Sequence, residues 1–90
     1  MERIRFAIPK GHLEVATFNA LERAGYVISG TERTYRPSIN DSKIELKILR
    51  PQEIPIFVSE GLQDVGITGL DWIKETHADV EVLLNLEYSK

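Results

Sequence analysis

Phe6-Ala7-Ile8-Pro9-Lys10-Gly11-His12-Leu13 is the stretch that decides the fold, because an apolar strand pattern runs into Pro-Lys-Gly and then into an amphipathic helix pattern. Apolar residues recur at helical spacing from Leu13 to Ala24, and Gly25 follows where a helix often ends. A lysine and a glycine at such a junction place a cation beside free backbone N–H groups at the positive end of a helix dipole. The stretch therefore predicts a strand over residues 3–8, an anion-binding turn and a helix.

The segment after this helix is harder to assign. Tyr26-Val27-Ile28 has the composition of a short strand, whereas residues 33–41 are polar and contain turn formers. Residues 26–42 are therefore predicted as a broken strand and a long loop. Residues 44–49 then alternate apolar and charged side chains, which predicts a strand with one polar face or an edge position.

A second helix is predicted directly after this strand. Pro51 can open a helix, and Pro55 is tolerated in a first turn because the backbone N–H groups there have no partner to lose. We expect the helix to run from residue 51 or 52 to Glu60, with Gly61 after it.

The last third of the chain repeats the strand, turn and helix pattern. Val65-Gly66-Ile67 predicts a short buried strand, and Thr68 with Asp71 has the spacing of a capping box for a helix over residues 69–77. Residues 80–86 are apolar enough to predict a final strand.

Alternating strands and helices with short connections predict an α/β fold, a mainly parallel sheet with flanking helices. Ligands of open parallel sheets bind at the carboxyl ends of the strands, where the loops that enter the helices gather. Seven residues of the chain lie in such loops and are the candidate site residues: Lys10, Gly11, His12, Arg50, Thr68, Gly69 and Asp71.

Composition limits the classes of function. The net charge of −3 predicts no general affinity for nucleic acid or anionic membranes, so an anion site requires local placement of basic groups. The chain has no cysteine, which excludes disulfides, thiolate metal sites and a cysteine nucleophile. His77 has no partner at the spacing of a zinc site, so we predict no metal-binding residues. No segment has a signal-peptide or membrane-spanning pattern, and a cytoplasmic location is expected.

Four stretches occur in register along the chain: Ile8-Pro9-Lys10-Gly11, residues 33–41 (RTYRPSIND), residues 49–55 (LRPQEIP) and residues 64–72 (DVGITGLDW). Together they resemble the catalytic subunit of ATP phosphoribosyltransferase, the first enzyme of histidine biosynthesis. Their order and spacing cover essentially all 90 residues.

The resemblance implies that residues 1–90 form the N-terminal part of the first catalytic lobe, in a fold like that of type II periplasmic binding proteins. The remainder of the family's chain, including its phosphoribosyl pyrophosphate loop, lies beyond residue 90, so this segment alone is expected to be inactive. The implied reaction is displacement of pyrophosphate from the ribose by N1 of ATP, with Mg²⁺ on the pyrophosphate and a homo-oligomeric enzyme. Arg33 matches a catalytic arginine of the family, and His12 stands where many members have arginine.

Simpler interpretations of the same residues stay open. Gly11 and Lys10 are also explained by a helix start beside an exposed lysine, Arg50 by an ion pair with Glu53, and Thr68 by helix capping. A different class of function also stays open. The chain is alternatively a non-catalytic half-lobe that binds nucleotide or phosphate and self-associates to cover its sheet edge.

Overall fold

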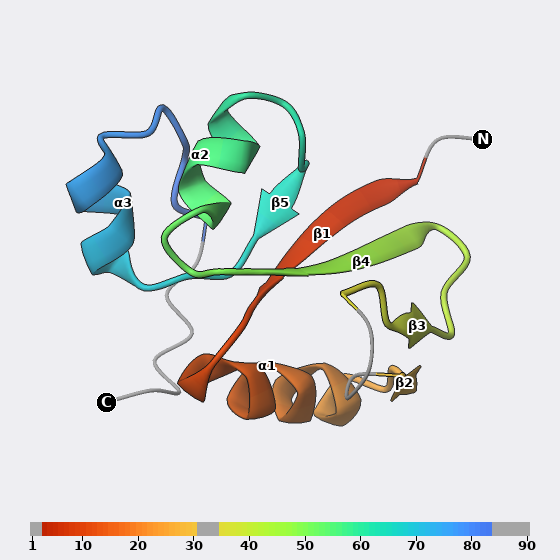
Figure 1. Ribbon diagram of the computed structural model, residues 1–90. Helices are drawn as coiled ribbons and strands as arrows, with labels where there is room; N and C mark the ends of the chain where they lie inside the picture. Colours follow the sequence, from red (N-terminus) through yellow and green to blue (C-terminus); the bar gives the residue numbers. More distant parts are fainter. Residues whose placement is uncertain (1–2, 31–34, 84–90) are drawn as a thin grey trace.

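A three-stranded parallel sheet between helices forms the centre of the computed structural model, which describes residues 3–30 and 35–83. Figure 1 shows helix α1 on one side of the sheet and helices α2 and α3 on the other. The α/β fold class with a parallel sheet and flanking helices, predicted from the sequence, is confirmed. The elements in chain order are β1 (Ile4–Pro9), α1 (His12–Arg23), β2 (Ile28–Ser29), β3 (Ser38–Ile39), β4 (Ile44–Leu49), α2 (Ile54–Ser59), β5 (Val65–Gly66) and α3 (Leu70–Thr76).

Strand β1 lies in the middle of the sheet, in the order β4-β1-β5. It pairs with β4 along its whole length, from Ile4 opposite Ile44 to Pro9 opposite Leu49. Its other side pairs with β5, which places Ala7 opposite Gly66. The central position explains why β1 becomes continuously apolar, since both of its faces are covered. Of the two alternatives expected for residues 44–49, one polar face or an edge position, the described sheet shows the edge position.

The two faces of the sheet pack against different helices. Ile8, Leu46 and Ile48 form one buried cluster, against which Phe18 and Leu21 of α1 pack. Ala7 and Leu49 form the other cluster together with Ile54 of α2, and Phe57 and Val58 complete it. Neighbouring residues of β1 and β4 thus point to opposite layers, as the side-chain alternation of a strand requires.

The described residues between 26 and 42 contain more structure than the sequence predicted. The short strand expected at residues 26–28 is shifted to Ile28–Ser29 (β2), and the predicted loop holds β3, which pairs with β2 in antiparallel fashion. Asn40 extends this pairing, because its side-chain Oδ1 accepts a 2.9 Å hydrogen bond from the Val27 N–H while its own N–H donates to the Val27 carbonyl. Ile39 packs on the α1 cluster, and this burial is what makes a polar-looking segment adopt strand geometry.

The predicted start of the second helix is wrong by two to three residues. Residues 51–53 form turns, in which the Glu53 N–H donates to the Arg50 carbonyl, and α2 begins only at Ile54. The physical reason is Pro55. It lies in the first turn of the shorter helix, whereas a start at residue 51 would place its missing N–H where an intrahelical hydrogen bond is required.

The predicted capping box before the third helix is also wrong. Gly69 is the N-cap residue of α3 and no side chain caps the helix, which spans residues 70–76 instead of 69–77. The Thr68 hydroxyl donates a 2.7 Å hydrogen bond to the Pro51 carbonyl instead. Residues 80–83 form no strand, and the rest of that prediction falls outside the described residues.

Candidate functional site at the carboxyl edge of the sheet

Lys10 and Gly11 form the turn that links the central strand to α1. The Lys10 N–H donates a 2.8 Å hydrogen bond to the Leu49 carbonyl, which extends the β1–β4 ladder one residue past the end of β1. Gly11 has φ 98° and ψ −145°, a conformation that side-chain-bearing residues rarely adopt. Glycine is therefore required for β1 to turn directly into α1.

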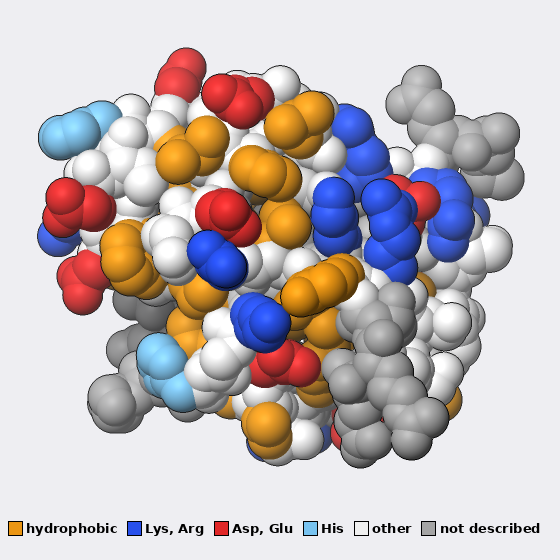
Figure 2. All heavy atoms as spheres, viewed as in Figure 1, with side chains coloured by type: hydrophobic (Ala, Val, Ile, Leu, Met, Phe, Trp, Pro, Cys, Tyr) orange, Lys and Arg blue, Asp and Glu red, His pale blue; other side chains and the backbone are white. Residues whose placement is uncertain are grey.

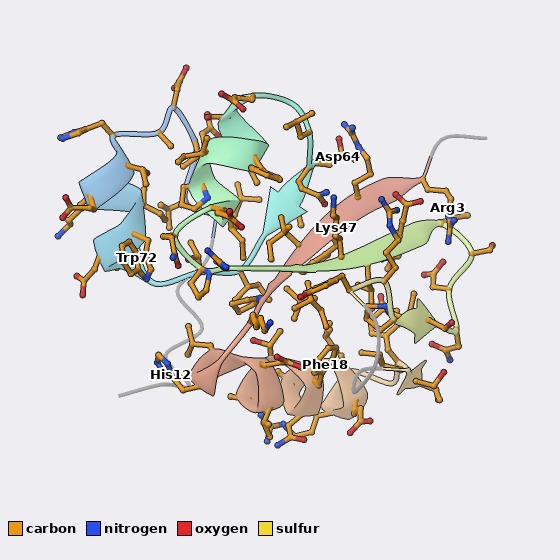
Figure 3. All side chains as sticks on the ribbon, in the orientation of Figure 1. Arg3, His12, Phe18, Lys47, Asp64 and Trp72 are labelled. Carbon is orange, nitrogen blue, oxygen red and sulfur yellow. The ribbon has the colours of Figure 1, made fainter. Side chains whose placement is uncertain are left out.

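The first turn of α1 has the features of an anion-binding helix start. Gly11 is its N-cap, so no side chain satisfies the first N–H groups of the 12-residue helix. His12 begins the helix and is exposed, as is Lys10. Figure 3 shows His12 at the same end of the molecule as Trp72 of α3. Unsatisfied N–H groups, a helix dipole and an exposed ammonium together provide a local positive potential.

Arg50 is held next to Lys10 by the sheet, since it directly follows the residue whose carbonyl binds the Lys10 N–H. Its side chain is exposed. The ion pairs in residues 3–30 and 35–83 are Arg3–Glu45 and Arg5–Asp64, so the alternative that Arg50 pairs with Glu53 is not what the structure shows. Two cations from neighbouring strand ends thus lie at the same edge.

Thr68 and the start of α3 lie on the far side of this edge. The Ile67 N–H donates to the Ala7 carbonyl, so the end of β5 lies beside β1, and the Thr68–Pro51 hydrogen bond joins the loop after β5 to the loop after β4. Gly69 and Asp71 follow at the start of α3, where Asp71 is exposed in the first turn. Asp71 brings a negative charge, so the positive potential of the edge is concentrated at Lys10, Gly11 and Arg50.

The structure adds one residue that the sequence analysis missed. Tyr35 lies with its ring under the Lys10 ammonium, whose Nζ is 5.2 Å from the ring centroid. Twenty-five positions separate the two residues, and no local periodicity connects them, so only a search for aromatic residues near candidate cations could have suggested the pair. Arg33, the predicted catalytic residue, lies outside the described residues.

At the opposite end of the sheet, charged side chains pair with each other and join neighbouring strands. Figure 2 shows Lys and Arg side chains gathered on the right of the molecule with acidic groups between them, and Figure 3 places Arg3 and Asp64 there. The Asp64 carboxylate accepts hydrogen bonds from the Arg5 guanidinium and the Arg5 backbone N–H, which lower the pKa of Asp64 to about 2. This pair joins the amino ends of β1 and β5, away from the candidate site.

The described part of the chain has neither of two further classes of site. It holds no group of three or more His, Cys, Asp or Glu side chains arranged to bind a metal ion. None of its helices has the length and apolar character needed to cross a bilayer.

Comparison with known proteins identifies relatives over nearly the whole chain. The family model described as "HisG: ATP phosphoribosyltransferase" matches residues 50–90. An ATP phosphoribosyltransferase from Desulforudis audaxviator is 44% identical over 88 residues, which are 98% of this chain and 30% of that protein. One from Nitratidesulfovibrio vulgaris strain DP4 is 47% identical over 87 residues, which are 97% of this chain and 30% of that protein.

A solved structure has the same fold. The ATP phosphoribosyl transferase (HisG:HisZ) complex from Thermotoga maritima contains a chain that superimposes with a TM-score of 0.72 at 24% identity, covering 87% of this chain and 37% of that one. The similarity predicted from the four sequence stretches is therefore confirmed, and the chain spans about 30% of the length of the curated relatives it matches.

Proposed function

The 90 residues are homologous to the ATP phosphoribosyltransferase family along nearly their whole length, and from this premise we propose that they form part of the catalytic chain of such an enzyme. The enzyme transfers the phosphoribosyl group of phosphoribosyl pyrophosphate to N1 of ATP, the first step of histidine biosynthesis. The observation that carries the proposal is an identity of 44–47% over 97–98% of the chain. Because the segment is about 30% of its relatives' length, it is expected to be inactive alone.

In this proposal the carboxyl edge of the sheet binds substrate phosphates. Displacement of pyrophosphate builds negative charge on the leaving group, and fixed cations and oriented N–H groups stabilise such charge without reorganising. Lys10, the first N–H groups of α1 behind Gly11, and Arg50 are the groups of that kind at this edge. His12 begins the same helix and contributes a further donor. Arg33 has the role of a catalytic cation near the reacting centre in this proposal.

The three remaining candidates receive more limited roles. The Thr68 hydroxyl proton is already donated to the Pro51 carbonyl, so Thr68 binds a substrate only as an acceptor. Gly69 lets the chain pass close to a ligand. Asp71 repels phosphate and is suited to accept hydrogen bonds from ribose hydroxyls or an amino group of the nucleotide.

Magnesium enters this proposal with the substrate. The described residues offer no set of ligands for the ion, so its oxygen ligands are expected from the pyrophosphate group. No step of the proposal depends on a metal held by these residues.

We further propose that residues 1–90 form the N-terminal part of the first lobe of a fold like that of type II periplasmic binding proteins, in a cytoplasmic homo-oligomer that binds ATP and phosphoribosyl pyrophosphate. The parallel sheet with helices on both faces (Figure 1) supports this assignment.

One observation favours the alternative of a self-associating, non-catalytic half-lobe. Helices α2 and α3 expose apolar side chains on neighbouring surfaces, with Ile56 39%, Leu70 46% and Trp72 39% exposed. Surfaces of this kind promote association. Sedimentation of the isolated chain together with an ATP titration separates the two functions, since an inert monomer that binds no ATP contradicts the alternative.

The proposal is tested in a chimera in which these 90 residues replace their counterpart in the Desulforudis audaxviator enzyme. We expect the chimera to release pyrophosphate from phosphoribosyl pyrophosphate only when ATP is present, and Lys10→Met to weaken substrate binding about 10- to 100-fold, as loss of a charge-assisted phosphate contact does. The matched control is Lys74→Met, which removes an exposed lysine on α3. A chimera with a cooperative melting transition and no activity would refute the proposed function.

A further inference from the structure

The Lys10 ammonium lies over the face of the Tyr35 ring, with Nζ 5.2 Å from the ring centroid. This distance is within the range of about 6 Å over which the quadrupole of an aromatic ring attracts a cation. The two residues come from separate parts of the chain, because Lys10 follows β1 whereas Tyr35 lies between β2 and β3.

Both residues are anchored to consecutive residues of β4. The Tyr35 carbonyl accepts a 2.7 Å hydrogen bond from the Ile48 N–H, and the Lys10 N–H donates a 2.8 Å hydrogen bond to the Leu49 carbonyl. The backbones that carry the ring and the ammonium are thus fixed by one strand. These anchors bring the backbones of Lys10 and Tyr35 to consecutive positions along β4.

Tyr35 has no burial role that would explain its ring. Its side chain is 62% exposed, and it is not among the residues that pack on either core cluster. Any substitution keeps the hydrogen bond to Ile48, since that bond uses the Tyr35 carbonyl. The ring therefore contributes little to the stability of the fold, and its cation–π partner among the described residues is Lys10.

We propose that Tyr35 is a positioning residue that holds the Lys10 ammonium at the carboxyl end of β1, ready for the phosphate group of an anionic substrate. The inference rests on the proposed function, in which Lys10 binds substrate phosphate. A free lysine loses the rotational freedom of a four-carbon stem when it binds an anion, and a ring that already restricts the stem removes part of that cost.

An aromatic ring suits this task better than a carboxylate. The ring attracts the ammonium through its quadrupole but carries no net charge, so the positive charge of Lys10 stays available to an anion on the other side. Neither ion pair of the described residues involves Lys10, so no carboxylate competes for the ammonium there.

The expected effects follow from the size of an exposed cation–π contact. Tyr35→Leu should weaken pyrophosphate binding and raise the KM for phosphoribosyl pyrophosphate about two- to fivefold, with a smaller change in kcat. Tyr35→Phe should retain the wild-type binding and KM because the tyrosine hydroxyl takes no part in the contact with Lys10. In a Lys10→Met background, Tyr35→Leu should have no further effect.

The test measures pyrophosphate binding and KM in the chimera for the wild type, Tyr35→Phe, Tyr35→Leu, Lys10→Met and the double variant. Tyr26→Leu serves as the matched control, because it removes a tyrosine beyond the other end of α1. In parallel, NMR of the 90-residue chain reports whether the Lys10 methylene protons lose their ring-current shift in Tyr35→Leu and keep it in Tyr35→Phe.

The outcomes separate this inference from the proposed function. If Lys10→Met weakens binding but Tyr35→Leu does not, Lys10 binds phosphate without help from Tyr35 and the inference is overturned. Failure of Lys10→Met to change binding overturns the proposed phosphate site and the inference together. Equal loss in Tyr35→Phe and Tyr35→Leu also contradicts the inference, since it would assign the effect to the hydroxyl. If the Lys10 methylene protons have the same chemical shift in the wild type, Tyr35→Phe and Tyr35→Leu, the ring does not contact Lys10 in solution and the inference is overturned.

Discussion

Gly66→Ala should destabilise the fold, because a side chain at position 66 of β5 would run into Ile54 of α2. A Cβ atom at position 66 would clash with Cγ2 of Ile54 and lie 3.4 Å from Cβ of Ala7. Ile54 is 1% exposed and packs with Ala7 and Leu49, so its methyl group has no free space to move into. The added methyl must therefore shift either β5 or α2.

The expected loss is about 1–2 kcal/mol of unfolding free energy. Overpacking a well-filled core costs about 1–3 kcal/mol, and the smaller conformational entropy of an unfolded alanine offsets about 0.4–1 kcal/mol of this. Gly66 does not have the positive φ that would add backbone strain. For a domain of this size, each kcal/mol lowers Tm by about 4–8 °C.

Thermal and urea unfolding followed by circular dichroism measure this loss. Gly69→Ala is the matched control, since its Cβ would meet only Trp72 Cδ1 at an ordinary 3.9 Å. Ile54→Leu removes the offending γ-methyl at nearly constant volume, so Gly66→Ala should cost at least about 0.5 kcal/mol less in that background. An equal cost in both backgrounds would refute the steric reasoning.

Three further predictions concern the charge pair, the turn and the proposed catalytic residue. Asp64→Asn should lower the stability of the fold near neutral pH, because the pKa of Asp64 falls from 3.8 to about 2 on folding. The stability that the Asp64 carboxylate contributes is fully present above pH 3.8 and is lost as the pH drops towards 2. The unfolding curves of variant and wild type should therefore converge near pH 2. Gly11→Ala should cost about 1–3 kcal/mol by urea unfolding, since its φ of 98° and ψ of −145° are strained for alanine; an unchanged midpoint would show that the turn relaxes freely. Arg33→Ala in the chimera should lower kcat more than it raises the KM for ATP, and a change confined to KM would limit Arg33 to ground-state binding.

The sequence by itself determined the helices and strands whose geometry depends only on residues close together along the chain. The first helix is predicted correctly, and Gly25 follows it with φ 101°, because helical spacing and a glycine in the left-handed region are properties of a short segment. The bounds of β4 match the predicted residues 44–49 for the same reason. The parallel sheet follows from the alternation of these elements, and the resemblance to ATP phosphoribosyltransferases follows from motifs that are themselves contiguous.

Only the tertiary structure decided where side chains find partners from distant parts of the chain. The Thr68 hydroxyl was predicted to cap the helix that follows it, but it donates to the Pro51 carbonyl, which the sheet brings close to it. Residues 38–39 became a strand because Ile28 and Ile39 share the α1 core cluster. The Lys10 ammonium contacts the Tyr35 ring in a fold that bonds the backbones of both residues to β4. Local periodicity encodes the shape of a segment, whereas competition among hydrogen-bond and charge partners is settled by which segments the fold brings together.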